Sequence, residues 1–128
     1  MADYTPHYTG GAQPFTATTA GAVTGGNVLI WSAANVVTVS GADSTAVCGV
    51  AAHDAASGAR VTVWPIEGCI HNLTAGAAIA ALAGVVSDTG GTVKTATIAT
   101  AAAAATLIGV AVTAGAGSPL TLRVQGRR

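Results

Sequence analysis

The chain has 128 residues, which is enough for one domain with a single core. Only 8% of the residues are charged and the formal net charge is +0, so phosphate neutralisation and electrostatic steering have little to act on. This composition argues against a nucleic-acid partner.

Hydrophobic residues make up 51% of the chain, yet aromatic residues make up only 4%. Ala, Gly, Thr and Val dominate, which predicts a fine-grained core and short strands joined by many turns. A surface with so few charges suggests that a partner covers much of it. The alternative is a soluble monomer with a polar coat of Ser, Thr and Gly.

The N-terminal residues 1–6 have neither the basic region nor the apolar region of a signal peptide, so we expect synthesis in the cytoplasm. Residues 95–122 carry no charge, but they mix Thr, Gly, Ser and Pro with few large aliphatic residues. Such a stretch is too weakly apolar to span a bilayer. We therefore expect no membrane partner.

Residues 1–14 show no hydrophobic periodicity and are predicted to form an extended N-terminal arm. The arm could be a disordered terminus, or it could order on a partner by strand addition or by seating its tyrosines in pockets. In the second case, the expected contacts with a partner or a neighbouring subunit are Tyr4, Pro6, His7, Tyr8, Pro14 and Phe15.

From Phe15 onward, Gly, Ser, Asn and Asp separate runs of roughly four to seven residues, as in an all-β sandwich or barrel. The clearest strands alternate aliphatic and polar residues, at 60–64 and at 120–124. Further strands are expected at residues 28–32, 36–40, 46–51, 68–73, 93–98 and 107–112.

Two segments have local helix propensity. The five alanines at 101–105 are too few to nucleate a helix alone, so we expect one helical turn or a loop there. Residues 75–82 are also rich in alanine, and four of these alanines favour a short helix: Ala77, Ala78, Ala80 and Ala81.

An internal repeat gives the organisation of the folded part. Cys-Gly-Val-Ala at 48–51 recurs as Ile-Gly-Val-Ala at 108–111, and the segments that follow also correspond, 55–63 with 114–122. Upstream, 23–29 pairs with 73–79, although an Ala/Gly/Val-rich chain could match itself by coincidence. The repeat predicts a single all-β domain at residues 15–128, a small β-sandwich or β-barrel-like fold of two similar halves sharing one core.

These fragments, taken in order, resemble the phage capsid cement, or head-decoration, family. The resemblance covers residues 15–124, and the long Ala/Thr stretch between Lys94 and Thr106 and the aromatic arm depart from the family pattern. The fragments that carry it are 23–29, 49–51, 55–63, 67–70, the Ala75-Gly76 turn and 108–111.

The resemblance implies a structural protein of the virion that is made in the host cytoplasm and binds the exterior of an assembled capsid. Its partner would be the lattice of the major capsid protein, which it would stabilise by bridging capsomers. It would associate with itself as a homo-oligomer such as a trimer, and it would be no enzyme. The alternatives are another virion or tail β module, such as a spike or adhesin domain that binds a receptor or glycan, and, less favoured, a small enzyme.

Metal chemistry has one weak candidate set in the sequence, Cys48 with His53 and Cys69 with His71, whose spacing is not that of a standard zinc site. The cysteines read better as small buried hydrophobic residues, and a disulfide is less expected than free thiols in a reducing cytosol. We expect no metal and no cofactor.

Catalytic patterns are also weak. His53, Asp54 and Ser57 are the residue types of a hydrolytic triad, but neighbouring residues point apart and no nucleophile elbow is present. We expect no catalytic residue and no small-molecule substrate.

The two tryptophans, Trp31 and Trp64, either anchor the core or form interface hot spots. The basic residues near the C-terminus either pair with acidic capsid residues or are solvated. They are Arg123, Arg127 and Arg128.

Overall fold

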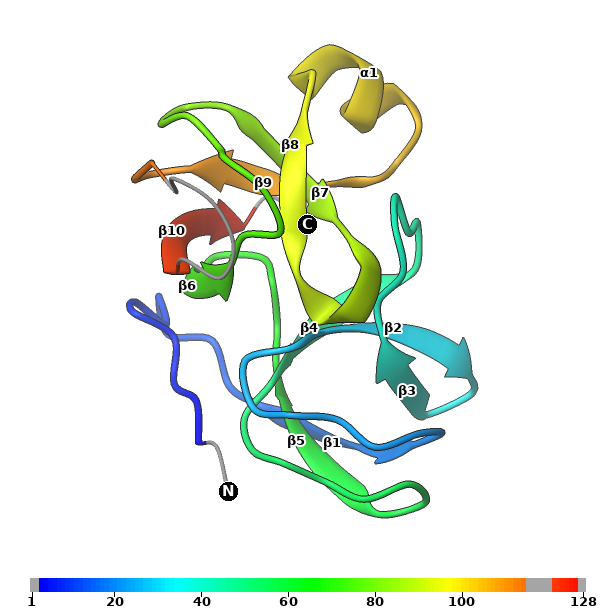
Figure 1. The fold of residues 1–128 in the computed structure, drawn as a ribbon. Helices are drawn as coiled ribbons and strands as arrows, with labels where there is room; N and C mark the ends of the chain where they lie inside the picture. The colour runs from blue at the N-terminus through cyan, green and yellow to red at the C-terminus, as the bar shows by residue number, and fades with distance from the viewer. Residues whose placement is uncertain (1–2, 115–120, 127–128) are drawn as a thin grey trace.

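The computed structural model describes residues 3–114 and 121–126, and Figure 1 shows two β-structures, one above the other. Within these residues there are ten strands, one short helix and one 3-10 turn, so the all-β prediction is confirmed. The first half contains β1 (Phe15–Thr19), β2 (Val28–Ala33), β3 (Val36–Val39), β4 (Val47–Ala51) and β5 (Arg60–Trp64). The second contains β6 (Ile70–Thr74), β7 (Gly84–Ser87), η1 (Thr89–Gly91), β8 (Val93–Ala96), α1 (Ile98–Ala103), β9 (Leu107–Ala111) and β10 (Thr121–Gly126).

The first half is a closed barrel in the order β1-β3-β2-β4-β5. The antiparallel pair β1–β5 and the parallel pair β1–β3 close it. Alternation explains β5, since Val61 and Val63 are buried inside while Thr62 faces outward. The strand predicted at 60–64 is therefore confirmed.

The second half repeats the topology of the first. Its strand order is β6-β10-β9-β7-β8, so corresponding strands have the same neighbours in both halves. In the first half, β1 pairs with β3 in parallel through Thr19 and Val37. At the equivalent place in the second half, a parallel bridge joins Ala75 to Val93. The predicted two similar halves are therefore present.

The two halves also share their register. Leu29 pairs with Gly49 and with Val39, and a register shift follows Leu29 on its β4 side. Val85 pairs with Gly109 and with Thr95, and the same shift follows it on its β9 side. Leu29 and Val85 are therefore equivalent positions, and the predicted match of 48–51 with 108–111 is correct.

Two of the predicted repeat alignments are wrong in register. In the first half, Val63 pairs with Phe15 and Ala51. In the second half, Val124 pairs in the same way with His71 and Ala111. Val63 therefore corresponds to Val124, two positions beyond the predicted Leu122. The upstream match of 23–29 with 73–79 is displaced further. The Gly26 amide donates to Ala51 and the Leu82 amide donates to Ala111, so Gly26 corresponds to Leu82.

The core consists of two clusters. One fills the barrel and includes Leu29, Val61 and Val63, all fully buried. The other joins barrel residues such as Val28 and Val50 to residues of the second half: Leu73, Ala75, Ile79, Val85, Val93, Ile108 and Ala111. Because this second cluster draws on both halves, the halves pack as one unit.

The helix predicted at 75–82 is wrong. Ala75 pairs with Val93, the Gly76 amide donates to the Val93 carbonyl at 2.9 Å, and Ile79 is 2% exposed, so backbone pairing and burial hold the segment in bridges, bends and a turn. Alanine propensity, worth tenths of a kcal/mol per residue, is overridden. The predicted turn at 101–105 is present as α1, which begins earlier, at Ile98. The remaining predicted strands are found with shifted ends.

No helix in residues 3–114 or 121–126 is long and apolar enough to cross a bilayer.

Candidate functional site

The residues of the possible hydrolytic triad serve three separate loops. His53 donates from Nδ1 to the Asp54 carbonyl at 2.9 Å and accepts the Thr62 amide at Nε2, 3.2 Å away. The Asp54 carboxylate accepts the Gly25 amide at 3.0 Å, and the Ser57 hydroxyl donates to the Ala20 carbonyl at 3.2 Å. Because these bonds run to backbone groups, they fix turns and form no proton relay.

Both cysteines are free thiols. Burial raises the pKa of Cys48 to about 12 and also raises the pKa of Cys69, whose thiol donates to the Thr9 carbonyl at 3.5 Å. Protonated thiols are poor nucleophiles and poor metal ligands. In the described part of the chain, no three His, Cys, Asp or Glu residues come together as a metal site.

The N-terminal arm lies across both halves of the molecule (Figure 1). Asp3 forms a bridge with His53, and the Tyr4 amide donates to the Ala52 carbonyl at 2.7 Å, just beyond β4. Further along, Tyr8 and Ile70 exchange two backbone hydrogen bonds of 3.1 and 2.8 Å at the start of β6. The arm therefore adds to the barrel first and to the second sheet next.

Tyr4 holds the arm through a buried histidine. Nε2 of His71 donates to the Pro65 carbonyl at 2.8 Å, so Nδ1 is the acceptor and the Tyr4 hydroxyl donates to it at 2.6 Å. The Asn72 amide donates to the same hydroxyl oxygen at 3.2 Å. The two rings also stack, with centroids 5.8 Å apart.

The six predicted contact residues divide into two sets. Pro6 is buried and Tyr4 is half-buried, so both face the body of the protein. His7, Tyr8 and Pro14 are exposed, and the half-buried Phe15 stacks on Trp31 at 5.8 Å. The arm thus presents an outward set that a partner can reach, and its role in contact stays a prediction.

Removing the Tyr4 hydroxyl should loosen the arm. In Tyr4→Phe the His71 Nδ1 atom and the Asn72 amide lose their partner, and a buried polar group without one costs about 1–3 kcal/mol. We expect the free energy of unfolding in urea to fall by about that amount. Tyr8→Phe is the matched control, because its ring is 58% exposed, and it should change stability by less than about 0.5 kcal/mol. Equal effects of the two variants would contradict this role for Tyr4.

Acid should also destabilise the protein through His71. Burial lowers the pKa of this imidazole, with the Pro65 hydrogen bond opposing in part. Below the ordinary value of 6.5 the unfolded chain takes up a proton that the folded one resists, so stability is complete above that pH and falls as the pH drops towards the lower folded pKa. Urea unfolding at about pH 7.5 and about pH 5 measures this. His71→Gln should flatten the slope, and an unchanged slope in this variant would exclude His71 as its source.

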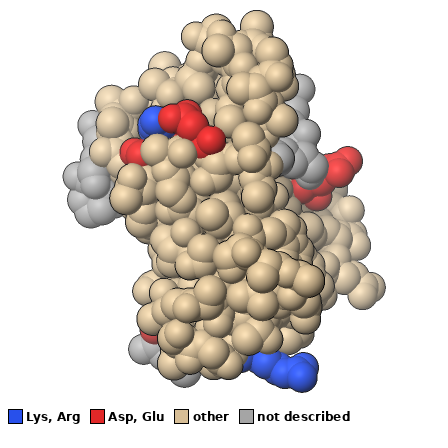
Figure 2. All heavy atoms as spheres, turned by 90° about the vertical axis from the view of Figure 1, so that its right-hand side faces the viewer, with Lys and Arg blue, Asp and Glu red and all other residues tan. Residues whose placement is uncertain are grey.

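The surface carries few charges. In Figure 2, Lys, Arg, Asp and Glu atoms gather in separate small groups, and the rest of this face, including the top, is uncharged. Lys94 Nζ and Asp43 Oδ2 form an ion pair, 2.8 Å apart. An ionic surface of this size cannot steer a charged partner.

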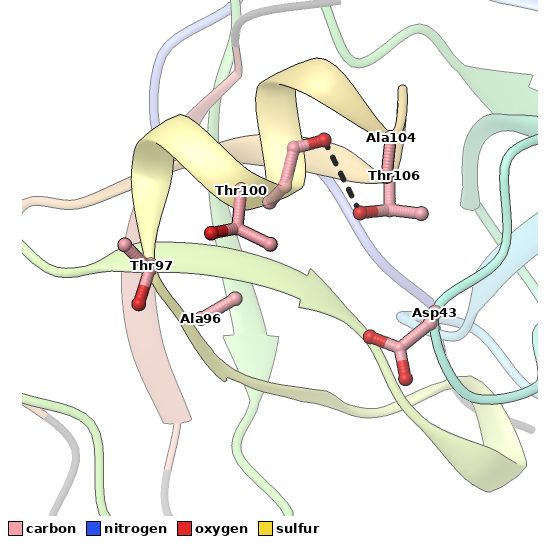
Figure 3. Close-up of a pocket in the computed structure, with 7 residues that line it drawn as sticks. Asp43, Ala96, Thr97, Thr100, Ala104 and Thr106 are labelled. Atoms are coloured by element: carbon pink, nitrogen blue, oxygen red, sulfur yellow. Dashed lines mark hydrogen bonds between the residues drawn. The ribbon is translucent and has the colours of Figure 1, made fainter.

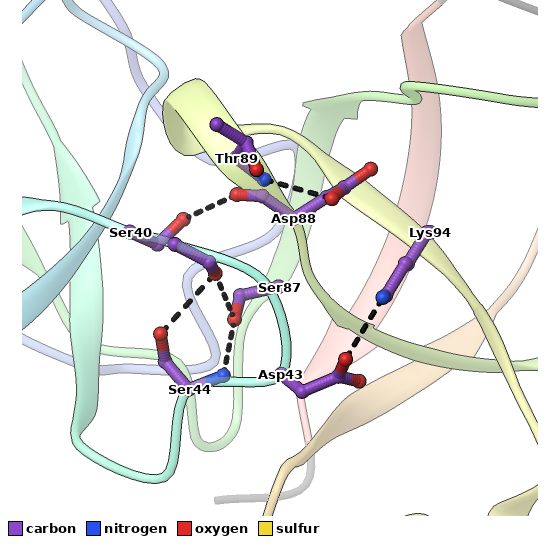
Figure 4. A network of polar contacts seen from close by, with 8 residues as sticks. Ser40, Asp43, Ser44, Ser87, Asp88, Thr89 and Lys94 are labelled. Atoms are coloured by element: carbon purple, nitrogen blue, oxygen red, sulfur yellow. Dashed lines mark hydrogen bonds and ion pairs between the residues drawn. The ribbon is translucent and has the colours of Figure 1, made fainter.

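A polar network links the halves beside that ion pair (Figure 4). The Ser40 hydroxyl donates to the Asp88 carbonyl at 3.1 Å, and the Ser44 amide donates to the Ser87 hydroxyl at 2.9 Å. Ser87 in turn donates to the Gly41 carbonyl at 2.9 Å. These hydrogen bonds pair buried and half-buried polar groups with one another, so the network positions two loops.

A cavity of about 260 Å³ opens between α1 and Asp43 (Figure 3). Its walls are mostly alanine and threonine, and the Thr106 hydroxyl is already bonded to the Ala101 carbonyl at 3.3 Å. The one carboxylate, Asp43, pairs with Lys94. The cavity therefore lacks the convergent polar groups of a small-molecule site.

Three large apolar side chains, which the sequence did not single out, are exposed at one end of the second half: Leu82 (75%), Ile98 (43%) and Val112 (44%). We call them the apex patch. The Leu82 amide bonds to the residue before Val112, and Ile98 lies against Gly84. A correct alignment of the two repeats would have pointed to this patch, because it places the large apolar Leu82 at the position that Gly26 occupies in the first half.

The sequence model of a family described as phage cement protein matches residues 7–126 of the chain. The fold is similar to that of the solved structure described as the head fiber gp8.5 N base in bacteriophage phi29. That similarity has a TM-score of 0.62 at 19% identity and covers 91% of this chain and 97% of the other. No curated protein matches the chain.

Proposed function

Because the chain belongs to the phage cement protein family, we propose that it binds the outer surface of an assembled phage head and stabilises the shell by bridging neighbouring capsomers. The family match over residues 7–126 is the observation that carries this proposal. The protein is a phage structural protein, and the proposed role requires no chemistry of its residues.

The surface supports binding to another protein. Its charges are few, and they leave a broad uncharged area on the face that Figure 2 shows. Its outward aromatic groups are those that commonly anchor interfaces, Tyr8 on the arm and Trp31, which is 40% exposed and stacked on Phe15. We place His7, Tyr8 and Pro14 in contact with the shell or with a neighbouring subunit.

Stabilisation of the shell would follow from mass action. A ligand that binds only the assembled lattice stabilises it by about 2.7 kcal/mol per site at a hundred times its Kd. Self-association, which we propose as a homotrimer, would let weak contacts act together, because a second contact on a linked copy is effectively intramolecular. The protein would then bind the outside of the virion firmly through several small interfaces.

Co-sedimentation with mature heads that lack decoration tests the proposal. Purified protein at micromolar concentration should pellet with the heads, and absence of binding would contradict the function. Because the surface has few charges, raising salt from about 50 to 200 mM should weaken binding far less than the thousandfold or greater loss seen for multiply charged contacts. Binding to glycan in place of heads would favour a spike or adhesin module.

Variants of the arm test the contact residues within the same assay. Tyr8→Ala removes an exposed ring and should weaken head binding while leaving the unfolding transition in place. Thr5→Ala, at another exposed arm position, is the matched control. Wild-type binding by Tyr8→Ala would remove the arm from the proposed contact, and sedimentation equilibrium of the free protein measures the oligomeric state.

A further inference from the structure

The two halves treat one equivalent end of their sheets differently. Gly26 and Leu82 occupy the same position, because their amides donate to Ala51 and Ala111 at 2.8 and 2.7 Å. Both have left-handed backbones, with φ of 91° and 70°. Since Ala51 corresponds to Ala111, the residues that follow, Ala52 and Val112, correspond as well.

In the first half the chain's own arm covers this end. The Tyr4 amide bonds to the Ala52 carbonyl at 2.7 Å, and a Cβ placed on Gly26 would lie 3.7 Å from the Tyr4 ring. The bridge between Asp3 and His53 continues the pairing. An extended segment with an aromatic side chain therefore lies along the end of β4 and over Gly26.

In the second half the equivalent end carries larger apolar side chains and leaves them in solvent. Leu82 stands in place of Gly26 and Val112 in place of Ala52, with 75% and 44% of their surfaces exposed. Ile98, at the start of α1, adds a third group beside Gly84. The segment that leads to β4 in the first half has no helix, so α1 is a feature of the second half alone.

Folding does not account for Leu82. A leucine held at a φ of 70° costs of order 1–3 kcal/mol, and a side chain that is 75% exposed recovers little of this by burial. Glycine, which the first half uses at this position, would carry no such cost. A strained, exposed apolar residue is best explained by a contact made outside the chain.

We propose that the apex patch docks an extended, uncharged segment of the capsid protein, which lies along the end of β9 as the arm lies along the end of β4. This inference rests on the proposed function and names the surface that performs it. Strand addition of this kind combines backbone pairing with pockets for alternate side chains. Only 8% of the residues of the chain are charged, which suits a segment without charges.

The arm of a second copy is a poorer occupant. In each copy Tyr4 is hydrogen-bonded to His71 and Pro6 is buried, so an exchanged arm would have to give up these contacts. Three side chains also offer far less than the roughly 800 Å² per partner of a stable two-protein complex. Such a contact gains strength from repetition, which a lattice supplies.

Head co-sedimentation of the full-length protein with apex variants tests the inference. Leu82→Gly removes the side chain and relieves the backbone strain, so it should hold or raise stability while lowering head affinity by about tenfold or more, and Val112→Thr should act in the same direction. Leu82→Met keeps an apolar group and is the matched control, with affinity expected within about twofold. Wild-type affinity of the Leu82→Gly, Val112→Thr double variant would overturn the docking site and leave the proposed function standing.

Cross-linking identifies the occupant. A photoreactive residue in place of Val112 should cross-link to the capsid protein on heads, while one in place of the exposed Ala56, in the loop between β4 and β5, should do so much less. Cross-links between copies, or none to the capsid protein on heads that bind the protein, would overturn the inference. Failure of the wild-type protein to bind heads at all would instead reject the proposed function, and the docking site with it.

Discussion

Replacing Gly49 by alanine is expected to lower the free energy of unfolding by about 3 kcal/mol, the upper range for forcing an extra methyl group into a packed core. Gly49 lies in β4, opposite Leu29, where the barrel leaves no room for a side chain. A Cβ there would overlap the carbonyl oxygen of Trp64 and lie 2.7 Å from Cγ1 of Val63. The first obstacle is backbone of the neighbouring strand, so a rotamer change cannot relieve it.

Gly41→Ala is the matched control for Gly49→Ala. It adds the same methyl group at a position where nothing lies within 4 Å of the new Cβ, so we expect a change within about 0.5 kcal/mol. Urea denaturation followed by tryptophan fluorescence measures both variants. Equal stability of Gly49→Ala and the wild type would show that β4 and β5 are more loosely packed than their pairing indicates.

Leu73→Ala is expected to cost about 2–5 kcal/mol and to weaken both halves together. Leu73 is 1% exposed on β6, and it belongs to the cluster that also contains Val28 and Val50 of the barrel. The cavity left by the Leu73 side chain would lie between the two halves, and collapse of the surrounding residues into it would restore little of the lost packing. We therefore expect one cooperative transition, shifted to lower denaturant.

Amide hydrogen exchange checks whether the halves respond as one unit. In Leu73→Ala, amides of β2 and β4 should lose protection by the same free energy as those of β7 and β9. Leu29→Ala provides the comparison, because Leu29 belongs to the cluster inside the barrel. A two-step transition in Leu73→Ala, with the barrel unfolding separately, would contradict a shared core.

The sequence predicted the architecture because alternation is a local signal. β5 was found at its true bounds, since two valines alternate with outward-facing polar residues. β7 was missed because all four of its residues are buried, and a short buried run has no period-two pattern. β1 was missed because its Thr-rich sequence follows the arm without a turn signal strong enough to separate the two.

Register and surface contacts were harder to predict because they depend on pairing across the sheet. The short repeat motifs located the two halves, but the residues that align Gly26 with Leu82 differ in type, and only their hydrogen bonds reveal the match. Nothing in the sequence pointed to the hydrogen bond between Tyr4 and His71, because these two residues are far apart along the chain. Exposure of Leu82 likewise depends on which strands surround it.

The ion pair beside the network of Figure 4 has a practical consequence for labelling the particle. Lys94 is the single lysine of the chain, so amine-reactive dyes have one side-chain target per copy. Its hydrogen bond to Asp43 raises the pKa of the ammonium group and keeps it protonated, which slows acylation and calls for a more alkaline coupling buffer. Once attached, the dye would sit where the two halves meet, a fixed place from which energy transfer between neighbouring copies could report their spacing on the shell.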